Sequence, residues 1–171
     1  QLGRVEYNAR RRQDVDVVFM LASHREARLI YPQFYHNRAA DIPVYSLANV
    51  YSGQQNMTEN VDLNGIHFCT IPWLFRDAYQ GHLSQQVVIN TQELSEQSLR
   101  LLAFGVDAYQ LVGHLGDLVD KPYQGATGTL SLDEGNRVVR DLVCAQFKQG
   151  EAKLLTGFSQ SAFEPIKDRA E

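Results

Sequence analysis

The sequence lacks the basic charge and the long apolar runs that mark two large classes of protein. Lysine and arginine number 16 against 20 aspartates and glutamates, which gives a net charge of −4. Nucleic-acid binding through phosphates needs a basic face. The longest apolar stretch, residues 15–22, contains Asp16 and falls far short of the roughly 18 to 20 residues that cross a bilayer. The sequence therefore predicts neither a nucleic-acid partner nor a transmembrane helix.

Cysteine is scarce, and an initiator methionine is absent. The two cysteines, Cys69 and Cys144, lie far apart, match no zinc or redox motif, and each sits in an apolar run. We favour buried free thiols and keep a disulfide in an oxidising compartment as the alternative. Because the chain opens with Gln1 and shows no signal peptide, we expect an internal or processed piece of a longer protein.

The motifs that carry catalysis or bind metals and cofactors are also absent. The five histidines include no i, i+4 pair with a following carboxylate, which a helix-borne zinc site needs, and there is no nucleophile elbow. Residues 125–129 are glycine-rich, but they lead into a strand and lack the lysine and the helix of a phosphate cradle. We therefore predict a turn there, a protein that is not an enzyme, and no metal site or cofactor.

What the sequence does contain is a strand, a helix and a strand in close succession. Residues 15–21 form a β-branched, nearly continuous apolar run, which is typical of a buried strand. Ser23, with Glu26 three residues later, is a capping box that starts a helix ending near Asn37. A second strand at residues 44–47 completes a βαβ unit, in which the two strands are parallel.

The middle of the chain predicts a loop, a strand and a long helix. We expect a long loop over residues 48–65, a third strand over 66–70, and an ambiguous stretch over 76–92 with a possible short helix. From Ser95 onward two apolar stripes recur at helical spacing, and their combined width predicts a helix buried on more than one side. Gly105 lies within this helix, and close packing against another backbone would explain it.

The last part of the chain predicts an antiparallel hairpin. Residues 129–132 alternate like a half-exposed strand, residues 133–136 form a turn, and residues 138–147 form the partner strand. The residues after Gly150 carry little signal, so we expect a frayed tail there.

The candidate site follows from the parallel strands. Such strands place their C-terminal ends at one edge of a sheet, where α/β proteins meet ligands and partners. The loops at these ends supply two serines, an asparagine and two aromatic residues as cleft or partner-contact candidates: Ser23, Ser46, Asn49, Tyr51 and Trp73. Amphipathic aromatics often anchor contacts. For Trp73 we favour a place in the core, and for Ser23 a helix cap.

The order of these segments resembles the second half of a type I periplasmic-binding-protein fold. Five segments in sequence resemble the C-terminal part of the LppC/LpoA family: Val-Asp-Val-Val-Phe-Met-Leu-Ala-Ser, Pro-Val-Tyr-Ser, Tyr-Ser-Gly, Ile-Pro-Trp-Leu and Gly-Val-Asp-Ala-Tyr. The resemblance covers about residues 14–150. It implies an α/β chain that is part of a two-lobed fold, with a parallel βαβ unit and a C-terminal antiparallel hairpin.

The resemblance also implies how the chain is divided. The implied parts are a lobe with the βαβ unit over 15–68, a segment of the other lobe with the long helix over 69–125, and a hairpin returning to the first lobe over 126–150. The residues outside the resemblance are a leader over 1–14 and a tail over 151–171. The first strands of both lobes, an amino-terminal helical-repeat domain and a lipidated cysteine would lie outside this chain. We expect exposed strand edges as a result.

The function implied by the resemblance is regulation of another protein. Members of the family are outer-membrane lipoproteins that activate a class A penicillin-binding protein, a bifunctional peptidoglycan synthase. The implied partner is that synthase, with peptidoglycan as a further candidate, and the implied location is the periplasmic side of the outer membrane. Contact with the membrane would come only through a lipid anchor outside this chain.

Two other functions fit the same elements, because a fold does not fix a function. A periplasmic solute-binding protein would close two lobes on a small polar ligand, with Ser23, Ser46 and Asn49 facing it. An activator would instead have a cleft filled or bridged by side chains such as Tyr51 and Trp73. The third possibility is an enzyme whose catalytic residues lie outside this chain.

Overall fold

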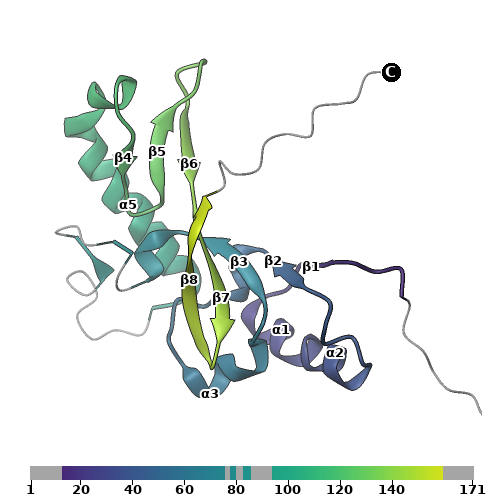
Figure 1. The fold of residues 1–171 in the computed structure, drawn as a ribbon. Coiled ribbons are helices and arrows are strands. Elements are labelled where there is room, and N and C mark those ends of the chain that lie inside the picture. Colours follow the sequence, from purple (N-terminus) through teal and green to yellow (C-terminus); the bar gives the residue numbers. More distant parts are fainter. Residues whose placement is uncertain (1–12, 76–77, 80–82, 86–93, 160–171) are drawn as a thin grey trace, which may run out of the picture.

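Two β-sheets of different size organise the fold in a computed structural model of the chain (Figure 1). The structure describes residues 13–75, 78–79, 83–85 and 94–159, with the last four residues of this range described by their backbone only. The larger sheet has the order β1-β2-β3-β7-β8, and the smaller sheet has the order β4-β5-β6. The leader expected over 1–14, the short helix expected within 76–92 and the end of the tail lie largely outside the described residues.

The expected βαβ unit is present and forms one side of the larger sheet. Strands β1 (Val18–Met20) and β2 (Val44–Ser46) pair in parallel, and β3 (His67–Thr70) continues the parallel order. Helices α1 (His24–Ile30) and α2 (Pro32–His36) make the connection between β1 and β2. The α/β class predicted from the sequence is therefore confirmed.

The helical segment between β1 and β2 is divided because of one proline. The capping box at Ser23 starts α1, as predicted. Pro32 then begins α2, because proline lacks the backbone N–H needed to continue a helix but suits a helix start. Tyr31, at the junction, is 4% exposed and joins the core.

The stretch expected as a long loop over 48–65 holds three short helical turns instead. They are η1 (Ala48–Val50), α3 (Met57–Asn60) and η2 (Val61–Leu63). The Asn56 side chain caps α3 by accepting a hydrogen bond from the Glu59 amide. The polar residues that favoured a loop therefore serve in part as a helix cap.

The expected C-terminal hairpin is only half right. Strand β5 (Thr129–Leu132) pairs with β6 (Val138–Asp141) as predicted, and β4 (Tyr123–Gln124) joins them. The predicted partner strand, however, breaks after Asp141. Its second part, β7 (Val143–Lys148), leaves the small sheet and pairs with β3 in the large one. One run of strand residues thus links the two sheets, as Figure 1 shows.

The residues after Gly150 begin with a strand rather than a frayed tail. Strand β8 (Glu151–Ser159) pairs with β7 in antiparallel register. Gln149 and Gly150, both at positive φ, make the tight turn between them. A side chain at position 150 would collide with the backbone of Met57, so the turn packs directly on α3.

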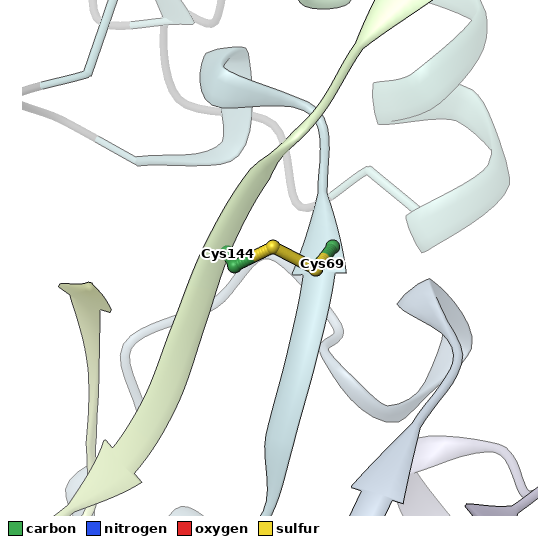
Figure 2. The surroundings of a disulfide bond; sticks show 2 residues. All are labelled: Cys69 and Cys144. Atoms are coloured by element: carbon green, nitrogen blue, oxygen red, sulfur yellow. A yellow bond between two sulfur atoms is a disulfide. The ribbon is translucent and has the colours of Figure 1, made fainter. Parts of the chain in front are cut away.

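A disulfide joins the two sheet strands β3 and β7, so the favoured expectation of free thiols is wrong. Cys69 and Cys144 lie directly opposite each other in the register, with their Cα atoms 3.9 Å apart, and they are bonded (Figure 2). Cysteines so far apart in sequence become neighbours only through the crossing of β7 between the sheets. The alternative of a disulfide is the one that the structure supports.

The long helix α5 (Glu96–His114) starts at the Ser95 cap as expected, but it is buried on one side only. Its buried residues are Leu99, Ala103, Val106 and Asp107. The opposite face exposes large apolar side chains: Leu101, Phe104, Val112 and Leu115. A Cβ added to Gly105 would meet nothing within 4 Å, so the expected backbone packing is also wrong. A short turn, η4 (Asp117–Val119), follows α5.

The core lies where the ends of β3 and β7 meet the segment after β2. Four aromatic rings pack there, and Tyr51 is at their centre. Its ring stacks on Phe75 with centroids 5.3 Å apart, and lies 5.5 Å from Phe68 and 6.0 Å from Phe147. Trp73, in the turn η3 (Pro72–Leu74), is 1% exposed and belongs to the same core.

Candidate functional site

The C-terminal ends of β1, β2 and β3 lie at one edge of the large sheet, because the three strands are parallel and in register. The segments that follow them begin α1, η1 and η3. The strand ends and the segments that follow them contain the five residues that the sequence predicts as cleft or contact candidates. The structure can therefore say how each of them is placed, and which polar atoms are engaged within the chain.

The two serines are hydrogen-bonded to their own neighbourhood. Ser23 donates from its hydroxyl to Glu26 at 2.7 Å and from its amide to the same carboxylate at 2.9 Å. These bonds, the backbone one first, lower the pKa of Glu26 below its ordinary value. Ser46 donates from its hydroxyl to the Met20 carbonyl at 2.8 Å, which ties β2 to β1. Ser23 therefore caps α1, and Ser46 stabilises the ends of β1 and β2.

Two of the remaining candidates are buried and one is exposed. Tyr51 and Trp73 lie in the core, at 0% and 1% exposure. The indole N–H of Trp73 donates to the Leu83 carbonyl at 2.9 Å, and the Trp73 amide donates to the Ala126 carbonyl at 3.0 Å. Asn49 is exposed on η1. The site is thus divided into a buried part and an outer part.

The outer part also carries two exposed leucines. Leu21 is 77% exposed and Leu47 is 57% exposed. They follow Met20 and Ser46, which are partners in the β1–β2 register. We call Leu21, Ser23, Leu47 and Asn49 the strand-end rim. Its apolar and polar side chains alternate along each segment, a mixture found at protein contact sites.

Arg100 is the central polar residue of the buried part, and the sequence reasoning missed it. From α5 its guanidinium donates to the Thr70 hydroxyl at 2.8 Å, to the Ala48 carbonyl at 2.8 Å and to the Tyr51 carbonyl at 3.3 Å. It also forms an ion pair with Glu96 at 3.0 Å. Arg100 therefore bonds the long helix to the ends of both β2 and β3. The only sign of this role in the sequence is a basic residue placed between two leucines, Leu99 and Leu101.

Asp107 makes a second connection from α5, to the turn between β4 and β5. Its buried carboxylate accepts hydrogen bonds from the Ala126 amide, the Thr127 amide and the Thr127 hydroxyl. A Cβ at position 125 would lie 2.8 Å from both carboxylate oxygens, so glycine is required by this close approach. The predicted turn is confirmed, and its amides are bound by the chain's own carboxylate.

A groove of about 1060 Å³ lies between α5 and the small sheet. Its polar centre is Gln110, whose side-chain oxygen accepts from the Tyr79 hydroxyl at 3.0 Å and from the Tyr123 hydroxyl at 2.7 Å. The ring of His114 stacks on Tyr123 with centroids 5.3 Å apart. Burial raises the pKa of both tyrosines, so both hydroxyls stay protonated donors at neutral pH. This network holds β4 against the helix.

The described part of the chain holds neither a cluster of metal-binding side chains nor a helix that could span a membrane. Within residues 13–75, 78–79, 83–85 and 94–159, no three histidine, cysteine, aspartate or glutamate side chains gather closely enough to hold a metal ion. In the same residues, no helix combines the length and the apolar content that crossing a membrane requires.

Comparison with known proteins gives a family and a fold. Residues 2–150 match the family described as "LppC putative lipoprotein". A curated relative from Vibrio antiquarius, named penicillin-binding protein activator LpoA, is 35% identical over 153 residues, which is 84% of this chain and 24% of that protein. A relative of the same name from Photobacterium profundum is 30% identical over 148 residues. The chain spans about a quarter of the length of these relatives.

Solved structures agree on the fold. The chain superposes on the LpoA (YraM) C-domain from Haemophilus influenzae, described as a regulator of PBP1A, with a TM-score of 0.66. The sequence identity is 23%, and the match covers 85% of this chain and 46% of that domain. The fold is thus that of half of a periplasmic-binding-protein-like domain. On the match over residues 2–150, the chain belongs to the LppC family of lipoproteins.

Proposed function

We propose that this chain is part of a non-catalytic periplasmic regulator that binds and activates a class A penicillin-binding protein during peptidoglycan synthesis. The observation that carries the proposal is the family match over residues 2–150, together with relatives named as penicillin-binding protein activators. An activator must bind the active form of its target more tightly than the inactive form. Such a protein needs a rigid contact surface rather than catalytic groups.

The strand-end rim is the proposed contact surface. Two exposed leucines support this choice, because exposed large apolar side chains bordered by polar ones are typical of interaction sites. Ser23 and Asn49 are exposed beside them and can contact the synthase directly. The other three predicted candidates are engaged within the chain: Ser46 bonds to Met20, and Tyr51 and Trp73 are buried in the core.

The alternative, a solute-binding protein, has less support from the same region. In open α/β sheets a small ligand is held at the C-terminal ends of the strands. Here the guanidinium of Arg100 occupies the polar groups at the ends of β2 and β3. Ser23 and Ser46, which would face a ligand, are bonded to Glu26 and Met20. These contacts favour an activator whose cleft is filled by its own side chains.

The lobe boundaries and the location remain part of this proposal. We assign residues 15–68 to one lobe and 69–125 to the other, since the first range contains β1, β2 and the start of β3, and the second contains α5. Residues 126–150 would return to the first lobe through β7.

The family description as a lipoprotein supports a position at the periplasmic side of the outer membrane, with the lipid outside this chain. Peptidoglycan is a further proposed partner.

The direct test measures binding of this chain to a purified class A penicillin-binding protein, with transpeptidase turnover followed in the same samples. We expect saturable binding and faster crosslinking. A folded chain that neither binds the synthase nor changes its turnover would overturn the proposal. A screen of small polar solutes in parallel tests the alternative, because a solute that stabilises the folded chain at low concentration would favour the solute-binding function.

A further inference from the structure

The guanidinium of Arg100 sits where a separate ligand would otherwise be held. We propose that Arg100 is an internal ligand of the strand-end region, and that the groups around it form a site for a guanidinium ion once the side chain is removed. By filling this site, Arg100 fixes α5 against the ends of β2 and β3. The inference concerns the chain alone and stands independently of the proposed function.

The site is built from three segments that are distant in sequence. Thr70 ends β3, the carbonyls of Ala48 and Tyr51 lie in and after η1, and Glu96 is the first residue of α5. All of them are within 3.3 Å of a guanidinium nitrogen. The acceptors therefore converge on one point, as they do around a bound ligand.

The chemistry of the site is specific for a guanidinium. Nη1 donates to the Thr70 hydroxyl, and Nη2 donates to the carbonyls of Ala48 and Tyr51 and to the Glu96 carboxylate. Nε donates to the same carboxylate at 3.2 Å. This division uses a planar fork of several donors, which an ammonium group does not have. The Glu96 carboxylate supplies the single negative charge that balances the cation. A monovalent planar cation is therefore the class of ligand that fits.

Removal of the side chain leaves these acceptors without their cation. Thr70 is completely buried, and a buried polar group that loses its partner costs its full desolvation free energy. The site is also partly open to solvent, because the Arg100 side chain is 23% exposed. A free guanidinium can therefore enter from solution and restore the hydrogen bonds.

The first experiment compares thermal unfolding of Arg100→Ala with that of the unaltered chain, with and without millimolar methylguanidinium. We expect the unfolding midpoint of the variant to fall by roughly 5 °C, as for loss of a charged hydrogen-bond network in a chain of this size. Methylguanidinium is expected to recover part of that loss in the variant and to leave the unaltered chain unchanged. Sodium chloride and urea at the same concentrations should recover nothing.

The matched control is Arg28→Ala on α1. Arg28 is also half-buried, at 30% exposure, and pairs with the carboxylates of Glu59 and Asp62 at 3.2 and 3.3 Å. Its partners are more exposed and include no buried hydroxyl, so no recovery by methylguanidinium is expected. Equal recovery in both variants would show a general ion effect and would overturn the proposal.

The second readout is the emission of Trp73, which is the only tryptophan of the chain and lies three residues after Thr70. We expect the emission of Trp73 to shift to the red in Arg100→Ala, because α5 is no longer bonded to Thr70 at the start of this segment. Methylguanidinium should reverse the shift. Arg100→Lys keeps the charge without the fork, and should also lower the midpoint and shift the emission. If Arg100→Ala does not fold, the lysine variant decides: a midpoint and an emission equal to those of the unaltered chain would overturn the proposal.

Discussion

The strand ends of the large sheet have a buried side and an outer side that differ in almost every respect. On the buried side, Tyr51 and Trp73 are packed in the core, and Arg100 bonds α5 to two other segments, the end of β3 and η1 with its C-cap. On the outer side, Leu21 and Leu47 expose most of their side chains. Both sides are built from the same short segments, since Leu47 and Tyr51 are only four residues apart.

The difference shows how one region can be rigid and still present a surface. Internal hydrogen bonds and aromatic packing fix the backbone, so that the rim has a defined shape before any partner arrives. A preformed surface loses less conformational entropy on binding than a mobile one. Changes on the buried side should therefore act on stability, and changes on the rim should act on binding.

The largest effect on stability is expected from the core. Trp73→Ala should reduce the free energy of unfolding by about 3–5 kcal/mol, because it removes a fully buried aromatic ring and leaves a cavity. Leu47→Ala, on the rim, should change it by less than about 0.5 kcal/mol. Urea unfolding of both variants measures the difference. Similar values for the two would remove the distinction between the buried and outer sides.

A somewhat smaller effect on stability is expected from the disulfide between β3 and β7. Replacing both Cys69 and Cys144 by alanine should reduce the free energy of unfolding by about 2–4 kcal/mol, since the bond closes a long loop of the unfolded chain. Urea unfolding with and without a reductant supplies the control. The reductant should destabilise the unaltered chain and leave the double variant unchanged; an unaltered chain insensitive to reduction would contradict the prediction.

A still smaller effect on stability is expected from His67 on β3, whose ring stacks on that of Tyr45 with centroids 5.0 Å apart. Burial lowers the pKa of His67 below its ordinary value, so the unfolded chain takes up a proton more readily than the folded one. Its contribution to stability is present above the ordinary histidine pKa of about 6.5. That contribution is lost as the pH falls from there through the lowered value.

Unfolding measured between pH 7 and pH 5 tests this dependence. The free energy of unfolding should decrease toward pH 5, and His67→Gln should flatten that slope. An unchanged slope in the variant would assign the dependence to other groups.

Local patterns could be predicted from the sequence, and distant contacts could not. The capping box at Ser23 and Glu26 and the helix start at Ser95 depend on residues three apart, so their outcome is visible in the chain itself. The Cys69–Cys144 bond and the contacts of Arg100 depend on which segments become neighbours in space. The break after Asp141 has the same origin, because β7 leaves its hairpin to pair with β3.

Contacts between distant segments also decide which of the predicted site residues are buried. Tyr51 and Trp73 are residue types that often anchor protein contacts, yet their exposure is decided by the side chains packed around them. The exposed face of α5 shows the reverse case: a wide apolar stripe indicates that a face can be buried, and does not say that it is. The width of the apolar stripes alone therefore overestimates the burial of α5.

The most direct test of the account measures binding of a rim variant to a purified class A penicillin-binding protein. The variant carries Leu21→Asp and Leu47→Asp, and its control carries Leu101→Asp, which changes an equally exposed leucine on the outer face of α5. We expect at least about a tenfold loss of affinity for the rim variant, equivalent to about 1.4 kcal/mol, and an unchanged affinity for the control. Unchanged binding by a folded rim variant, or equal losses in both, would contradict it.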